Sequence, residues 1–134
     1  SEAEDVETVF NQNWRDGLSS SLKTGLCELL RISPDCAAAL VVLADQPLIN
    51  AGHLNRFASV LREKNVAVVA AEYGGTIGVP ALFSRSTFSA FDELKGDVGA
   101  KAVIEEFSDD LATISLPEAA FDIDTPEDFA RLLI

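Results

Sequence analysis

The sequence predicts an α/β domain in which a sheet of apolar strands is covered by helices. Its clearest strand is Ala37–Ala44, a run of eight apolar residues that stops at Asp45. An uninterrupted run of Ala, Val and Leu is typical of a strand buried on both faces of a parallel sheet. Segments with helical and with strand character then alternate along the chain, as they do in layered α/β folds.

The other strands are expected where short β-branched, aromatic or small apolar runs lie between turn residues. These strands are Val6–Phe10, Val66–Ala71, Gly78–Ser84 and Leu111–Leu116. Pro80 marks the third of them as an edge or irregular strand near a site, because proline has no N–H to donate to a ladder.

Helices are expected where apolar residues recur every three or four positions behind a capping residue. They begin near Ser19, Ala51, Ser86, Asp97 and Pro126. Asp97 is the expected N-cap of the fourth helix. The sequence contains no repeat and no low-complexity linker, so residues 1–134 are expected to form a single domain.

Three serines, Ser19, Ser20 and Ser21, stand at the start of the first helix. Their hydroxyls suit the capping of free backbone N–H groups. A helix N-terminus also attracts anions and donates hydrogen bonds to them, so the same serines could face a ligand. The residues alone leave both readings open.

The composition excludes several classes of partner. The net charge is −12, and nucleic acids and anionic membranes select basic surfaces instead. No apolar stretch reaches the roughly 18 residues that a membrane helix needs. The N-terminus lacks signal-peptide character, and two cysteines are too few for a disulfide framework. A reducing cytoplasm is the expected location.

Thiol and histidine chemistry are not indicated either. Cys27 lies within the first helix and is expected to be a small buried apolar residue. His53 is the sole histidine, so a Ser-His-Asp triad would have to be built on it. It lies in an ordinary polar helix, where a surface role is expected.

Asp45 is the first candidate for a chemical role. Ligands in open α/β sheets bind just beyond the carboxyl ends of the strands, and Pro47 ends the ladder there. A carboxylate in this place suits Mg²⁺, which prefers carboxylate and phosphate oxygens. The alternative is that Asp45 only caps the helix that follows, and the apolar run alone does not decide between the two.

Five stretches together point to a family. They are Trp14–Gly25, Leu43–Pro47, Gly78–Phe83, Gly96–Lys101 and Asp122–Asp128. In this order and spacing the chain resembles the nucleotidyltransferases of molybdenum cofactor maturation over nearly its whole length. The cytidylyltransferases are the nearest match, with the guanylyltransferases as close relatives.

The resemblance implies a three-layer, Rossmann-like (GT-A-like) nucleotidyltransferase fold with a mostly parallel sheet. It also implies Mg²⁺-dependent transfer of CMP from CTP to the terminal phosphate of molybdopterin, with release of pyrophosphate. An alternative within the enzyme class is transfer to a sugar phosphate. Phosphoryl-type transfer needs positioning and charge neutralisation more than covalent chemistry. Two carboxylates that hold Mg²⁺ on the triphosphate supply much of this positioning and neutralisation.

The resemblance also assigns site residues. Asp45 matches the main Mg²⁺ ligand and Asp124 the second metal-side residue, both with catalytic roles, and Asp122 is the less expected ligand. The residues expected along the nucleotide or on the acceptor side are Gly17, Ser20, Ser21, Pro80, Gly96 and Asp97. The alternative for Asp122 and Asp124 is helix capping, because Asp-x-Asp-Thr-Pro-Glu before a helix satisfies a cap and the helix dipole.

One departure from the family pattern concerns the triphosphate. Family members begin with a Gly-rich, basic loop after the first strand, whereas no such loop precedes Asp45 in this chain. We therefore expect an N-terminally truncated domain that has little activity alone. The alternative function is a non-catalytic domain of the same fold that binds a ligand or a partner chain.

Truncation would also leave a sheet edge uncovered. In the family the first strand lies beside the strand expected at Ala37–Ala44, and an exposed edge is a template for another strand. Either Val6–Phe10 pairs with this edge, or two copies of the chain form a homodimer through it. We expect the homodimer, because a five-residue strand is short for the purpose.

Overall fold

The computed structural model describes residues 10–12, 14–42 and 50–120 of the chain. The expectations for Asp45, Pro47 and the final helix lie outside these residues. So do those for Asp122 and Asp124 and for all but the last residue of the strand expected at Val6–Phe10.

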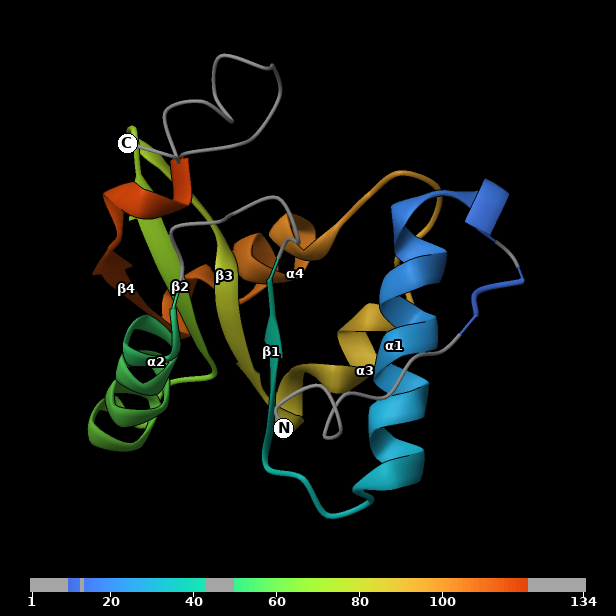
Figure 1. The fold of residues 1–134 in the computed structure, drawn as a ribbon, viewed down its shortest axis with the longest axis horizontal. Helices are drawn as coiled ribbons and strands as arrows, with labels where there is room; N and C mark the ends of the chain where they lie inside the picture. The colour runs from blue at the N-terminus through green and yellow to red at the C-terminus, as the bar shows by residue number, and fades with distance from the viewer. Residues whose placement is uncertain (1–9, 13, 43–49, 121–134) are drawn as a thin grey trace.

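Helices and strands alternate along the described chain, so the α/β class is confirmed (Figure 1). The α-helices are α1 (Leu18–Ile32), α2 (Ala51–Lys64), α3 (Phe88–Phe91) and α4 (Ala100–Glu106). The strands are β1 (Ala38–Val41), β2 (Val68–Tyr73), β3 (Thr76–Ser84) and β4 (Leu111–Ser115). Short 3-10 helices are η2 (Trp14–Asp16), η3 (Arg85–Thr87), η4 (Ser108–Asp110) and η5 (Pro117–Ala120).

The described strands form one sheet in the order β1-β3-β2-β4. β2 and β4 pair in parallel, whereas β3 pairs antiparallel with both β1 and β2. It follows that β1, β2 and β4 run in one direction and β3 runs against them. The expected mostly parallel sheet is therefore right for strand direction, but most of the described pairings are antiparallel.

The strand predicted at Ala37–Ala44 differs from its prediction in burial and in pairing. It is described as Ala38–Val41, all four residues are half-buried, and its described neighbour is the antiparallel strand β3. An apolar run indicates that a strand prefers to be buried. It does not indicate which other strand pairs with that strand. The expectation of a central parallel strand buried on both faces was therefore wrong for the described sheet.

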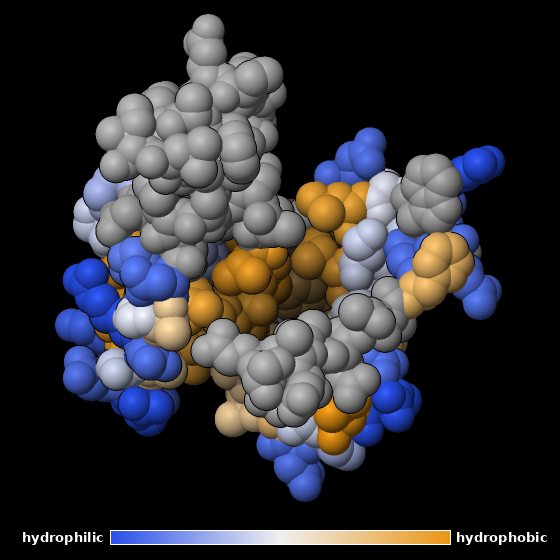
Figure 2. All heavy atoms as spheres, in the orientation of Figure 1, coloured by the Kyte–Doolittle hydropathy of each residue, from blue (hydrophilic) through white to orange (hydrophobic). Residues whose placement is uncertain are grey.

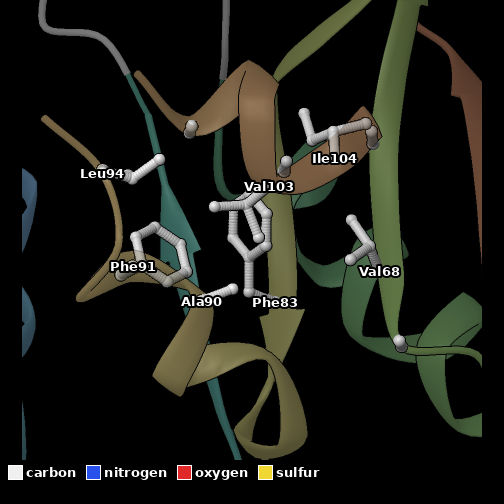
Figure 3. Close-up of a cluster of buried hydrophobic side chains, with 11 residues drawn as sticks. Val68, Phe83, Ala90, Phe91, Leu94, Val103 and Ile104 are labelled. Carbon is white, nitrogen blue, oxygen red and sulfur yellow. The ribbon is translucent and has the colours of Figure 1, made fainter. Parts of the chain in front are cut away.

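Helices cover both faces of the sheet (Figure 1). Alternate strand residues point to opposite faces, and Val69, Ala71 and Leu82 pack with Phe57 of α2 on one face. On the other face, strand residues that include Phe83 pack with α3 and α4 (Figure 3). Leu22 and Leu26 of α1 are partly buried against the same cluster. The Phe83 and Phe91 rings meet edge to face, with centroids 5.1 Å apart, a favourable aromatic geometry.

The β3 strand is irregular at Pro80, as the sequence predicts, although it is not an edge strand. The register with β2 shifts from Ala70 opposite Ala81 to Ala71 opposite Gly78, so the irregularity falls at Val79 and Pro80. A proline is tolerated at such a bulge because no ladder N–H is required of it.

The N-termini of α2 and α4 test two predictions about which residue caps each helix. α2 begins with a capping box: the Asn50 side chain accepts from the His53 N–H and the His53 side chain accepts from the Asn50 N–H, each at 3.1 Å. Asp45 is therefore not the N-cap of α2. α4 begins at Ala100 with Gly99 as its N-cap, so the prediction of Asp97 as N-cap was wrong.

None of the described helices is long and apolar enough to cross a membrane.

The two-sided core predicts a clear contrast between two phenylalanines. Phe83 is fully buried, whereas Phe10 is 76% exposed. We expect Phe83→Ala to lower the free energy of unfolding by about 3–5 kcal/mol and Phe10→Ala to change it by less than about 0.5 kcal/mol. Urea denaturation followed by circular dichroism measures both. Equal losses would contradict the packing described for β3.

Candidate functional site

A crevice separates α1 from the sheet at the side where β1 ends. Its first part is a cavity of about 390 Å³, lined among others by Leu22, Leu26, Leu29, Ala39, Val41 and Phe91. Its second part is a cavity of about 290 Å³, lined among others by Leu22, Val41, Tyr73, Ile77, Ala100 and Lys101. Leu22 and Val41 belong to both parts, so the two cavities adjoin. Figure 2 shows this side of the molecule hollowed, with hydrophobic residues on the floor of the hollow.

The crevice lies where ligands are expected in this class of fold. Ligands of open α/β sheets bind beyond the carboxyl ends of the strands. Val41 is the last residue of β1 and lines both cavities. The next residues along the chain lead to Asp45, the predicted metal ligand, which lies outside the described residues.

The first turn of α1 is held against the turn around Gly96. The Ser19 N–H donates to the Gly96 carbonyl oxygen at 3.0 Å, and Ser19 is buried. Gly17, the N-cap of α1, has φ +99°, and a Cβ there would lie 2.4 Å from the Gly96 oxygen. Only a residue without a side chain fits so close an approach with positive φ. Gly17, from the expected nucleotide side, thus touches Gly96 and Asp97, from the expected acceptor side.

The N-cap of α1 is Gly17 and not one of the serines. Gly17 makes no side-chain cap, and the Ser20 hydroxyl donates back to the Gly17 carbonyl oxygen at 2.8 Å. The Asn11 amide donates to the hydroxyls of Ser20 (2.9 Å) and Ser21 (3.1 Å), and Thr24 donates to the Asn11 oxygen (3.2 Å). Of the two readings that the sequence leaves open, a serine as the N-cap of α1 is therefore not the one observed.

Asn11 is a site-forming residue that sequence reasoning missed. The available signal was the spacing of Ser20 and Thr24, which places two hydroxyls on one helix face. Such a face needs a polar partner, and Asn11 provides it from the preceding segment.

A polar hollow of about 350 Å³ lies beside this turn. Asp16, Ser20, Lys23, Lys95 and Gly96 are among its lining residues. It brings two lysines to the start of α1, where the helix dipole also favours negative charge. The hollow therefore suits an anionic group, and Ser20 and Gly96 both line it as predicted site residues.

The remaining predicted residues lie apart from this hollow. Ser21 lines the first cavity instead. Pro80 is fully buried in β3, although its neighbours Gly78 and Val79 line the second cavity. In this arrangement Pro80 shapes the cavity wall through the bulge, and its own side chain is not available for contact.

The described residues do not include the predicted metal ligands. Asp45, Asp122 and Asp124 all lie outside them. Within the described ranges, no three His, Cys, Asp or Glu side chains are grouped so that they could hold a metal ion. Any group of three such side chains in this chain would include at least one residue outside the described ranges.

The solvent side of α1 carries its own ion pair. The Arg31 guanidinium donates to the Glu28 carboxylate and holds the pKa of that carboxyl below its usual value. Cys27 is exposed, which corrects the expectation that it is buried. Both observations show that α1 is less covered than its leucine pattern predicts.

Comparison with known proteins identifies the class. A family model described as the MobA-like NTP transferase domain matches residues 1–112. The fold of the described residues is therefore that of an NTP transferase domain. The chain belongs to the MobA-like NTP transferase domain family.

Individual relatives agree with this membership. The purine catabolism protein PucB of Bacillus subtilis (strain 168) is 28% identical over 123 residues, which cover 88% of this chain and 57% of that protein. An Rv0371c homologue from Mycobacterium sp. strain JC1 is 32% identical with a TM-score of 0.67, over 87% of this chain and 57% of that one. The chain thus spans less than two thirds of the length of these relatives.

Two further solved structures share the fold. Rv0371c of Mycobacterium tuberculosis H37Rv, solved in complex with manganese, is 26% identical with a TM-score of 0.66, over 96% of this chain and 63% of that one. Molybdopterin-guanine dinucleotide biosynthesis protein A of Archaeoglobus fulgidus has a TM-score of 0.66 at 13% identity, over 97% of this chain and 68% of that one. The second likeness is one of fold alone.

The contact between Gly17 and Gly96 predicts opposite effects for two alanine substitutions near α1. Gly17→Ala places a Cβ against backbone at positive φ, so we expect a loss of about 1–3 kcal/mol in the free energy of unfolding. Gly25 lies inside α1 with open space at its Cβ position, so Gly25→Ala should gain about 0.5–1 kcal/mol. Thermal unfolding measures both changes. A Gly17→Ala variant as stable as the parent would mean that the α1 start is not held as described.

Proposed function

We propose that this domain serves the Mg²⁺-dependent transfer of CMP from CTP to the terminal phosphate of molybdopterin, in the cytoplasm. The observation that carries the proposal is the crevice at the carboxyl end of β1, directly before Asp45. Membership in the MobA-like family supports nucleotidyl transfer. The choice of CTP and molybdopterin comes from the sequence motifs, and the name of the Archaeoglobus fulgidus relative agrees with a molybdopterin acceptor.

The proposed reaction is an in-line displacement. An oxygen of the acceptor phosphate attacks the α-phosphorus of CTP and forms a new P–O bond. The bond from the α-phosphorus to the bridging oxygen of the β-phosphate breaks, and pyrophosphate leaves with that electron pair. Such transfer depends on alignment and on stabilisation of charge.

The described residues have positioning roles in this proposal. Gly17, Ser20 and Ser21 lie along the nucleotide, where the start of α1 and the nearby Lys23 and Lys95 favour phosphate oxygens. Gly96, Asp97 and Pro80 define the acceptor side, Pro80 through the bulge that shapes the second cavity. That cavity is mainly apolar, which suits a planar ring system, and Lys101 at its rim suits an acceptor phosphate.

The metal would be held by residues outside the described ranges. Asp45 and Asp124 are the proposed Mg²⁺ ligands, with Asp122 as the less expected one. When bound, Mg²⁺ neutralises charge on the triphosphate and on the departing pyrophosphate. The Mycobacterium tuberculosis relative was solved in complex with manganese, which supports the use of a divalent ion.

A non-catalytic ligand-binding or partner-binding role is the second candidate. The observation that favours it is the absence of a Gly-rich basic loop before Asp45 in the sequence. A triphosphate without such a cradle of N–H donors loses much of its electrostatic hold. The proposed protein partner is a second copy of the chain.

These considerations predict slow transfer by the 134-residue chain. With labelled CTP, Mg²⁺ and molybdopterin, we expect CMP transfer well below about 1 per second, a low rate for an enzyme. Product and pyrophosphate are quantified together, with GTP and a sugar phosphate as competing donor and acceptor. Faster turnover would contradict the non-catalytic second candidate, and a preference for GTP or for the sugar phosphate would contradict the proposed substrates.

Metal-dependent nucleotide binding tests the aspartates separately from turnover. We expect Asp45→Asn and Asp124→Asn to weaken Mg²⁺-dependent CTP binding by about tenfold or more, each removing one charged ligand. Asp35→Asn, the same change at the opposite end of β1, should leave binding unchanged. Isothermal titration with and without Mg²⁺ measures the differences. Equal affinities for all three variants would contradict the proposed site.

A further inference from the structure

The Asn11 side chain makes three hydrogen bonds with the first two turns of α1. Its amide nitrogen donates to the hydroxyl oxygens of Ser20 (2.9 Å) and Ser21 (3.1 Å), and its amide oxygen accepts from the Thr24 hydroxyl (3.2 Å). The bonds join residues that are nine to thirteen positions apart in the sequence. One half-buried side chain therefore holds three hydroxyl groups of the helix in place.

The chemistry of the partners fixes which way the Asn11 amide faces. The Ser20 hydroxyl donates its single proton to the Gly17 carbonyl oxygen at 2.8 Å, so toward Asn11 its oxygen can only accept. The amide group that faces Ser20 is therefore the NH₂. Because an NH₂ group has two protons, it also donates to Ser21, and the amide oxygen is left to accept from Thr24.

This orientation gives Ser21 a defined hydrogen-bonding state. A serine hydroxyl has one proton to donate and an oxygen that accepts. Toward Asn11 the Ser21 oxygen accepts, so its proton points in another direction, and it is donated to none of the residues that the structure describes. Ser21 is exposed and lies at the crevice.

The three serines at the start of α1 thereby differ in what they can offer a ligand. Ser19 is buried, and Ser20 gives its proton to Gly17. Ser21 is exposed and has a proton to donate. It is therefore the serine of this turn that is best able to donate a hydrogen bond to a bound molecule.

We propose that Asn11 is a positioning residue, which presents the Ser21 hydroxyl as a hydrogen-bond donor to the bound nucleotide. The inference rests on the proposed function, in which Ser20 and Ser21 lie along the nucleotide. The group that Ser21 recognises is an acceptor atom, either on the base and ribose or on a phosphate. Asn11 itself does not touch the nucleotide and acts through Ser21.

Two physical effects make a held serine a better donor than a mobile one. A side chain that is already ordered loses less conformational entropy when the ligand binds. In addition, hydrogen bonds in a chain polarise one another, so a hydroxyl that accepts from an amide donates more strongly. Both effects are lost when the amide of Asn11 is removed, although Ser21 itself is still present.

A double-mutant cycle for nucleotide affinity tests the inference. Isothermal titration with CTP is carried out on the 134-residue chain and on Asn11→Ala, Ser21→Ala and the double variant. Each single change should weaken binding by about threefold to tenfold, as loss of one hydrogen bond does. Because Asn11 acts through Ser21, the double variant should bind within about twofold of Ser21→Ala. Gln12→Ala, at the exposed neighbour of Asn11, should bind as the parent does.

A purely structural role for Asn11 gives a different pattern. If Asn11 only tethers its segment to α1, Asn11→Ala weakens binding by the same factor with and without Ser21. That result would overturn the inference and leave the proposed function intact. A parent chain that binds no CTP at millimolar concentration would instead overturn the nucleotide site itself, and the inference with it.

Two further measurements identify the acceptor atom and check the fold. Cytidine has no phosphate, so an effect of Asn11→Ala on cytidine and CTP alike assigns the acceptor atom to the base or ribose. An effect on CTP alone assigns it to a phosphate, and either result supports the inference. Circular dichroism confirms that each variant is folded. If Asn11→Ala fails to fold, Asn11→Leu replaces it in the cycle, because leucine is similar in size and has no N–H donor in its side chain.

Discussion

The pairing of β3 with two neighbours is the interaction on which the described structure depends. β3 holds β1 on one side and β2 on the other, both antiparallel. Arg85, at the end of β3, secures the approach to β1 by donating from its guanidinium to the carbonyl oxygens of Pro34 (2.6 Å) and Cys36 (3.0 Å). These contacts fix where β1 begins, and therefore where it delivers the chain at the rim of the crevice.

The second constraint is the contact between the α1 start and the Gly96 turn. It joins segments about eighty residues apart through one backbone hydrogen bond and a glycine that admits no side chain. This contact fixes the start of α1, and a crevice lies between α1 and β1. The site is thus a consequence of two backbone arrangements, one in the sheet and one at a helix terminus.

Much of this fold was predictable from local patterns. The periodicity of α1 and α2 and the apolar runs of β2 and β4 lie in neighbouring residues, and the observed elements match them closely. Pairing was less predictable, because the apolar run at β1 is compatible with a parallel or an antiparallel neighbour. The predicted burial of this strand was wrong for the same reason. Burial depends on which elements lie beside the strand, and the apolar run does not determine them.

The site was predictable only in part. Motif resemblance selected Gly17, Ser20 and Gly96. The structure places Gly17 against Gly96, and Ser20 and Gly96 line one hollow. These residues come together through a contact between segments that are distant in the sequence. The spacing of the residues along the chain therefore could not predict this contact. Asn11 was missed because a single polar residue in a loop has no pattern, and its role appears only when three hydroxyls converge on it.

The central proposal is that a divalent ion binds in the crevice at the carboxyl end of β1. Paramagnetic broadening of backbone amide signals by Mn²⁺ tests it most directly, because the effect falls off with distance from the ion. The account predicts the strongest broadening at Val42 and Ser21, and little at Val60 in α2. Broadening centred on Asp109 and Asp110, which precede β4 at the opposite end of the sheet, or spread evenly over the acidic surface, would contradict it.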